Sequence, residues 1–145
     1  IINMFKFLWI DCEMSGLDPH NNQLLEIACI LTDAKCETLL QGPEIVLHAT
    51  KEHLDQMDDG NITPQRFGAG SKVHRKQYNS GVAEATIIEF LTSNGVKEGQ
   101  VIIAGNTIHM DRLFIRKEMP KLNSFLHYRI LDVTCLKIVV GIHRP

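Results

Sequence analysis

The sequence predicts a mixed α/β fold, in which an antiparallel three-strand meander is followed by parallel strands and helices lie on both faces of the sheet. Three apolar runs in the first third of the chain are too close together for crossover helices, so they should pair antiparallel. Helical and strand patterns then alternate, which favours parallel pairing. The 145 residues, 44% apolar and 22% charged, match a single domain over 1–145.

The predicted strands of the first half are residues 5–13, 24–32 and 44–48. The first is rich in aromatic and β-favouring residues and ends before the turn signals Gly16 and Pro19. The tripeptide 41–43 (QGP) marks a turn before the third strand. Residues 50–57 can form a short helix with Thr50 as its N-cap, and 61–79 are predicted to be irregular because they combine glycines, a proline and basic side chains.

The second half begins with a helix over 82–92, whose apolar side chains recur at helical spacing. Residues 101–104 are all apolar, as expected of a short central strand. A helix over 111–119 should end at Pro120. A very short strand at 130–131 and a helix over 133–140 complete the pattern. No apolar run approaches the ~20 residues of a membrane helix, so we expect no membrane partner.

The formal net charge of −2 argues against a large nucleic-acid surface, but a short anionic ligand could still meet a few basic groups or metal ions. The four cysteines form no C-x-x-C pair and no zinc-like spacing with histidine, which favours a reducing compartment. The N-terminal residues reach Asp11 without a basic leader or a small-residue cleavage site, unlike a signal peptide. We therefore expect a cytoplasmic protein, with a mitochondrial location as the alternative.

The sharpest local signal is Asp11-Cys12-Glu13 at the end of the first predicted strand. Because side chains alternate along a strand, Asp11 and Glu13 share one face, with carboxyl groups about 7 Å apart. Such a pair is costly to bury unless a cation lies between its members, and Mg²⁺ or Mn²⁺ would remove that cost. The alternative is a solvated strand end, and the tripeptide alone favours that alternative because it is common.

Asp111 adds a third carboxylate, after the predicted strand 101–104 and its loop. The alternative role for Asp111 is the N-cap or a first-turn acid of the following helix. For Asp132 the cap role is the stronger interpretation, and Asp18 before Pro19 is typical of a turn. His53 and Asp58 have the spacing H-x-x-x-x-D, but one match among seven histidines is weak, and the pair precedes Asp111.

Six segments resemble oligoribonucleases, the 3′→5′ exoribonucleases of the DEDDh group that degrade very short RNAs. They are 9–18 (WIDCEMSGLD), 26–30 (EIACI), 41–43 (QGP), 104–108 (AGNTI) with Asp111, 117–120 (KEMP) and 127–133 (HYRILDV). The first matches the family's first exonuclease motif. The similarity runs in the right order through nearly the whole chain. It implies an RNase H-like sheet and a phosphodiester hydrolase with two Mg²⁺ or Mn²⁺ ions roughly 4 Å apart.

The resemblance also implies roles for individual residues. Asp11 would bridge both ions, and Glu13 and Asp111 would complete much of their coordination. Leu17 matches a leucine that wedges between the two bases of a dinucleotide. Three positions match a cap on the 5′ phosphate, which explains a preference for short single-stranded RNA: Thr107, Arg129 and Thr134. Tyr128 and Arg129 match residues presented to the partner subunit's active site, so a homodimer is implied.

The chain departs from the family in two places. No H-x-x-x-x-D pair follows Asp132, so the general-base histidine and fourth carboxylate of the third motif are missing, and His143 has no aspartate after it. Gly60 and Gln65 stand at a tryptophan and a histidine position. We therefore expect a C-terminally incomplete domain with little activity of its own. The rival hypotheses are a catalytically incomplete nucleotide-binding or dimerisation module of the same fold, and an unrelated α/β protein with solvated carboxylates.

Overall fold

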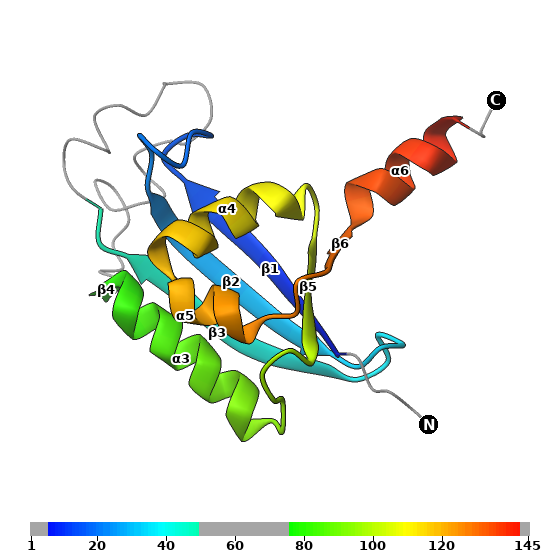
Figure 1. The fold of residues 1–145 in the computed structure, drawn as a ribbon, viewed down its shortest axis with the longest axis horizontal. Coiled ribbons are helices and arrows are strands. Elements are labelled where there is room, and N and C mark those ends of the chain that lie inside the picture. Colours follow the sequence, from blue (N-terminus) through cyan, green and yellow to red (C-terminus); the bar gives the residue numbers. More distant parts are fainter. Residues whose placement is uncertain (1–5, 50–75, 143–145) are drawn as a thin grey trace.

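A computed structural model describes residues 6–49 and 76–142, which form one six-stranded mixed sheet (Figure 1). The strands lie in the order β4-β3-β2-β1-β5-β6. Strand β1 pairs antiparallel with β2, and β2 with β3, whereas β1–β5, β5–β6 and β3–β4 are parallel. The predicted meander and the parallel strands after it are confirmed. The bounds are β1 Lys6–Met14, β2 Leu24–Thr32, β3 Leu39–Leu47, β4 Gln77–Tyr78, β5 Val101–Gly105 and β6 Ile130–Asp132.

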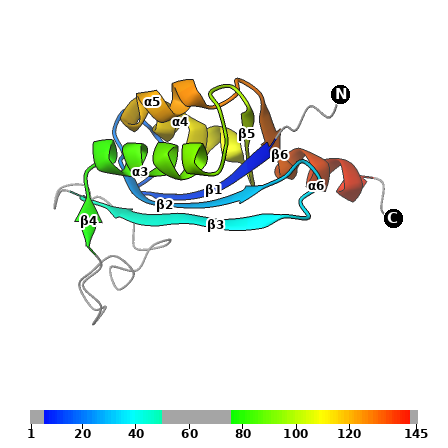
Figure 2. The same ribbon diagram turned by 90° about the horizontal axis from the view of Figure 1, so that it is seen from below.

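Four helices are described: α3 (Ser80–Ser93), α4 (Ile108–Glu118), α5 (Pro120–Phe125) and α6 (Val133–Ile142). Figure 2 shows α3, α4 and α5 on the same side of the sheet, with α6 extending away from the β6 edge. The core lies between these three helices and the sheet, and its largest fully buried side chain is Phe114. Within the described residues, no helix has the length and apolarity needed to span a bilayer.

Strand β3 begins five residues earlier than the sequence predicts, and it includes Gly42 and Pro43. The pairing with β2 shifts register between Ala28 and Ile30, which marks a bulge opposite these two residues. A bulge tolerates a proline because it interrupts the ladder of backbone hydrogen bonds. The glycine is required by space, since a Cβ on Gly42 would lie 2.7 Å from the carbonyl oxygen of Cys29. The expected turn is therefore a bulge within a strand.

Helix α4 begins three residues before the predicted start, at Ile108. Thr107 precedes it in the left-handed conformation, with φ of 56°. Asp111 is thus a first-turn acid and not the N-cap. Pro120 ends α4 as expected but also opens α5, a helix that the sequence analysis missed; proline suits the first turn, where its missing N–H has no helical partner.

Two further differences concern the segment before α3. Residues 77–78 form the short strand β4, within a stretch that was predicted to be irregular. The helix expected at 50–57 and most of the irregular stretch lie outside the described residues. The helix predicted at 82–92 is confirmed as the longer α3, whose N-cap is Asn79: its side-chain oxygen accepts a hydrogen bond from the backbone N–H of Val82 at 2.8 Å.

Candidate active site

The end of β1 presents two acids on the sheet face opposite the core. Cys12 is buried against the helices, whereas its neighbours Asp11 and Glu13 are exposed and half-buried. This is the alternation expected of a strand. Glu13 is paired directly with Glu26 of β2 across the sheet. Like charges in directly opposite positions repel each other, and this face of the sheet is acidic at the end of β1.

Asp111 reaches β1 from the first turn of α4. It is 7% exposed, and its Oδ1 accepts a hydrogen bond from the backbone N–H of Cys12 at 2.9 Å. Burial raises the pKa of the Asp111 carboxyl, the hydrogen bond from Cys12 acts against that rise, and the negative charge of Asp11 adds to it. The third carboxylate is therefore fixed to the backbone between the other two acids, and it senses the charge of Asp11.

The same neighbourhood excludes Cys12 as a nucleophile. Burial and the nearby charge of Asp111 hold the pKa of the Cys12 thiol well above its ordinary value. The thiol therefore stays protonated at neutral pH, and only a thiolate attacks efficiently. Cys12 contributes its backbone N–H to the site and its side chain to the core.

The donors at this place suit a hard divalent cation, because three carboxyl groups supply only oxygen ligands. The positions of these carboxyl groups fit a metal site less well than their chemistry does. Across residues 6–49 and 76–142, no three His, Cys, Asp or Glu side chains are arranged so that they could hold one ion. The structure thus brings Asp111 to β1 and into the field of Asp11, but it does not gather Asp11, Glu13 and Asp111 into one closed cluster.

A second group of predicted residues meets where α4 and α6 begin. The backbone N–H of Thr107 donates to Thr134 Oγ1 at 2.9 Å and to Asp132 Oδ1 at 3.0 Å, and the two threonine hydroxyls lie 3.1 Å apart. Asp132 also accepts a hydrogen bond from the N–H of Thr134 at 3.0 Å, which supports its predicted cap role. Two of the three residues proposed for a phosphate cap are therefore in contact.

Two residues beside this threonine pair, Asn106 and Lys137, have no role predicted from the sequence. Lys137 Nζ donates to Asn106 Oδ1 at 2.8 Å, and the same oxygen accepts from Thr134 Oγ1 at 3.1 Å. Lys137 lies three residues after Thr134 and so on the same side of α6. That spacing was the only signal in the sequence, and an isolated lysine in a helix is ordinarily a solvated surface residue.

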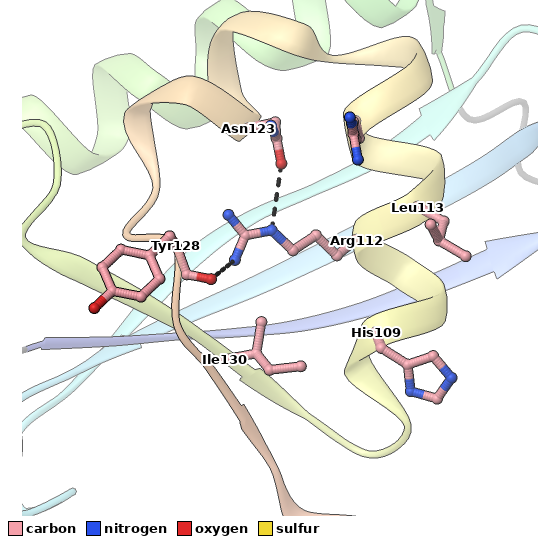
Figure 3. A pocket seen from close by; sticks show the side chains of 7 residues that line it. His109, Arg112, Leu113, Asn123, Tyr128 and Ile130 are labelled. Atoms are coloured by element: carbon pink, nitrogen blue, oxygen red, sulfur yellow. Dashed lines mark hydrogen bonds between the residues drawn. The ribbon is translucent and has the colours of Figure 1, made fainter.

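The third group is the loop 127–129 before β6. Tyr128 is 74% exposed; its ring stacks on His127, with centroids 4.5 Å apart, and the guanidinium of Arg129 lies 5.3 Å from its centroid. Figure 3 shows the loop beside a hollow that is also lined by Arg112 of α4. Leu17, 73% exposed, lies in the β1–β2 loop.

Comparison with known proteins now defines the class. Residues 8–144 match the family model described as "Exonuclease". The chain is 45% identical over 136 residues to a probable oligoribonuclease of Caenorhabditis elegans, covering 93% of this chain and 70% of that protein. It is 41% identical over 144 residues to the oligoribonuclease of Escherichia coli strain K12, covering 99% of this chain and 79% of that one. The chain belongs to the oligoribonuclease family of exonucleases.

Solved structures agree at the level of the fold. Exonuclease I in its apo form superimposes with a TM-score of 0.66 and 17% identity, over 97% of this chain and 31% of that one. A metal-free complex of Escherichia coli exonuclease I with single-stranded DNA gives a TM-score of 0.62 and 20% identity, over 97% and 30% of the two chains. The RNase H-like sheet implied by the sequence is therefore confirmed.

Proposed function

We propose that the protein is a divalent-metal-dependent 3′→5′ exoribonuclease that degrades very short oligoribonucleotides to mononucleotides. The observation that carries this function is its identity of 40–45% with oligoribonucleases over 91–99% of the chain. An unrelated α/β protein would not share that identity. The alternative of a nucleotide-binding or dimerisation module without catalysis is not favoured either, because the relatives matched over this length are oligoribonucleases by name and the family model is that of an exonuclease.

Exonucleases of this family depend on divalent metal ions. Asp11, Glu13 and Asp111 are the residues that would hold Mg²⁺ or Mn²⁺ here, and their oxygen donors suit either ion. Such ions activate water and stabilise the attacking and leaving oxygens of an in-line displacement. The chain's own contribution is to fix Asp111 through the N–H of Cys12 and to hold Asp11 and Glu13 on one face of a central strand.

The threonine pair, the loop 127–129 and Leu17 are the proposed substrate contacts. The hydroxyls of Thr107 and Thr134 form one polar surface at the start of α4 and α6, which suits a terminal phosphate that accepts hydrogen bonds. Leu17 and Tyr128 are exposed and apolar enough to pack on bases, and Arg129 adds a positive charge beside Tyr128. We propose that these five residues select short, 5′-phosphorylated RNA.

Two properties belong to the same proposal. The first is a homodimer in which Tyr128 and Arg129 serve the partner subunit's active site; their exposure on this subunit supports it. The second is a cytoplasmic location. All four cysteines are free, and Cys12 and Cys29 are buried, which fits a reducing compartment.

The test is hydrolysis of a 5′-phosphorylated diribonucleotide by the full-length protein with Mg²⁺ or Mn²⁺. Asp11→Asn should abolish hydrolysis while leaving the melting temperature nearly unchanged, because it removes charge without volume. Asp33→Asn, at the exposed β2–β3 turn, is the matched control and should keep full turnover. Equal turnover in wild type and Asp11→Asn would refute the role of Asp11, and absence of turnover in every form would refute the function.

A second comparison tests the contribution of an H-x-x-x-x-D pair. A positioned general base contributes about 10²–10⁴-fold to the rate. The chain of residues 1–145 should therefore be nearly inactive, and the same chain extended after Pro145 by an H-x-x-x-x-D segment from an oligoribonuclease should be active. Rapid hydrolysis by residues 1–145 alone would mean that a group within them supplies the base.

A further inference from the structure

Arg112 connects helix α4 to the exposed loop 127–129 through hydrogen bonds. Its side chain is half-buried, and Nη1 donates to the carbonyl oxygens of His127 and Tyr128, both at 3.0 Å, and more weakly to that of Arg129 at 3.4 Å. Nε donates to Asn123 Oδ1 of α5 at 3.3 Å. Figure 3 shows the guanidinium between α5 and the loop, with the bonds to Asn123 and Tyr128 drawn.

The partners recorded for the Arg112 guanidinium are uncharged. In the described part of the chain, the recorded hydrogen bonds of Arg112 all go to neutral carbonyl and amide oxygens, and none goes to a carboxylate. Burial lowers the pKa of Arg112, and the positive charge of Arg116 lowers it further. Among the described residues Arg112 has no recorded carboxylate partner, so its cost of burial is set against bonds that place the loop. A guanidinium suits the task, because its fixed fork of donors can reach several carbonyls at once.

The bonds turn the loop carbonyls toward α4 and leave the side chains outside. His127 N donates to the carbonyl of Val101 in β5 at 2.8 Å, which anchors the start of the loop, and Arg129 N donates to His127 Nδ1 at 3.0 Å, which closes the loop on itself. The exposed side chains then form a stack of His127, Tyr128 and the Arg129 guanidinium. A stack held by these contacts before a ligand binds would lower the entropy cost of binding.

Arg112 follows Asp111 directly in the first half of α4, and the two side chains point in different directions. Asp111 binds the backbone of β1, and Arg112 binds the loop. A helix is rigid on the scale of one turn, so these two contacts fix the exposed stack relative to β1 of the same subunit.

We propose that Arg112 is a positioning residue for substrate: it holds Tyr128 and Arg129 in the arrangement that receives a short oligonucleotide. This role rests on the proposed exoribonuclease function. Arg112 does not touch the reacting atoms. Its loss should therefore weaken substrate binding and leave the chemical step largely intact, which appears as a raised KM at a nearly constant kcat.

The experiment compares Arg112→Gln, Arg112→Lys and Arg116→Gln in the full-length protein, with a 5′-phosphorylated diribonucleotide. Arg112→Gln should raise KM about 10- to 100-fold, the range expected when a binding group is misplaced by about 1 Å, and change kcat by less than about threefold. Arg112→Lys should be intermediate because an ammonium reaches fewer carbonyls. Arg116→Gln is the matched control: it removes a cation one turn further along α4 that lines the same hollow, and it should behave as wild type.

Amide hydrogen exchange supplies the structural readout. Arg112→Gln should speed exchange at residues 127–130 and leave the β1–β2 amides protected. Faster exchange in the loop with unchanged KM would overturn the proposal, because Arg112 would then be purely structural. A fall in kcat at constant KM would also overturn it, since Arg112 would then act through Asp111.

A binding measurement distinguishes failure of the Arg112 role from failure of the proposed exoribonuclease function. If the wild type hydrolyses nothing, the proposed function fails, and the same diribonucleotide is titrated calorimetrically. At least about tenfold weaker binding by Arg112→Gln than by the wild type would support the role of Arg112. Equal affinities, or no binding by the wild type, would overturn it.

Discussion

Removal of the Glu84 carboxylate should destabilise the protein through a helix that Glu84 does not belong to. Glu84 lies on α3 and is only 6% exposed; its Oε1 accepts hydrogen bonds from the backbone N–H groups of Lys121 and Leu122, at 2.5 and 2.9 Å. These are first-turn donors of α5, whose own N-cap residue, Met119, makes no side-chain cap. Glu84 therefore caps α5 from outside, and α5 carries the Asn123 that binds Arg112.

The size of the effect follows from the two donors. The N–H of Leu122 is buried, and leaving it without a partner costs about 1–3 kcal/mol. The N–H of Lys121 is part-buried, so water can replace much of its bond, at a cost of about 1 kcal/mol. Glu84→Ala should thus lower the free energy of unfolding by about 2–4 kcal/mol, or the melting temperature by about 5–12 °C in a domain of this size. Glu84→Gln keeps a neutral acceptor and should lose roughly half as much.

Urea denaturation monitored by circular dichroism measures these differences, with an unchanged m-value as evidence that the unfolding transition is the same. Glu89→Ala is the matched control, because Glu89 lies on the exposed side of α3 and its removal should cost less than about 0.5 kcal/mol. If Glu84→Ala were as stable as Glu89→Ala, the two bonds to α5 would contribute nothing, and the external cap would be refuted.

Three other variants test separate parts of the structure. Arg129→Ala should weaken binding of a 5′-phosphorylated diribonucleotide more than of a longer RNA, measured as KM for each length; equal losses would remove Arg129 from the phosphate cap. Gly42→Ala should destabilise by about 1–3 kcal/mol in urea, because the new Cβ meets the Cys29 carbonyl, whereas Gly141→Ala, where a Cβ meets nothing within 4 Å, should not. Hydrogen bonds from the N–H groups of the β2–β3 turn, first that of Glu37, lower the pKa of Asp33. The stability that Asp33 adds is therefore present above the ordinary aspartate pKa, and it is lost as pH falls through the lowered pKa. The melting temperatures of wild type and Asp33→Ala should therefore differ most near neutral pH and converge in acid; a gap that does not change with pH would show that the charge is not involved.

Local patterns predicted most elements of the fold. The bounds of β2 agree with the prediction at both ends, because a mostly apolar run, interrupted only by Glu26 before its final Thr32, is enclosed by polar turns. The errors arose where one residue type has two uses. Pro43 was interpreted as a break but occupies a bulge, and Pro120 ends one helix and begins the next. Of the two helix roles open to Asp111, the structure has the first-turn acid; Thr107 is the N-cap, in a left-handed conformation that its side chain does not predict.

The candidate site was predictable in composition but not in geometry. Alternation along a strand places Asp11 and Glu13 on one face, and burial of Cys12 on the other face confirms it. The bond from Asp111 to the N–H of Cys12 joins residues 99 positions apart, so only packing determines it. The role of Arg112 could not be predicted, because a cation on a helix is ordinarily solvated. Its three carbonyl partners belong to the backbone, which is the same for every residue type.

The central position of β1 in the sheet determines the order in which the three acids of the candidate site come together during folding. The meander joins segments that are neighbours in the chain, whereas β1 meets β5, and Asp111 meets Cys12, only after a long loop has closed. Contacts between near neighbours form faster than contacts across such a separation. Asp11 and Glu13 therefore come together early, on a sheet that still lacks its third acid. A chain stopped partway along this route holds the two acids of β1 without Asp111, which arrives only when α4 docks on the sheet.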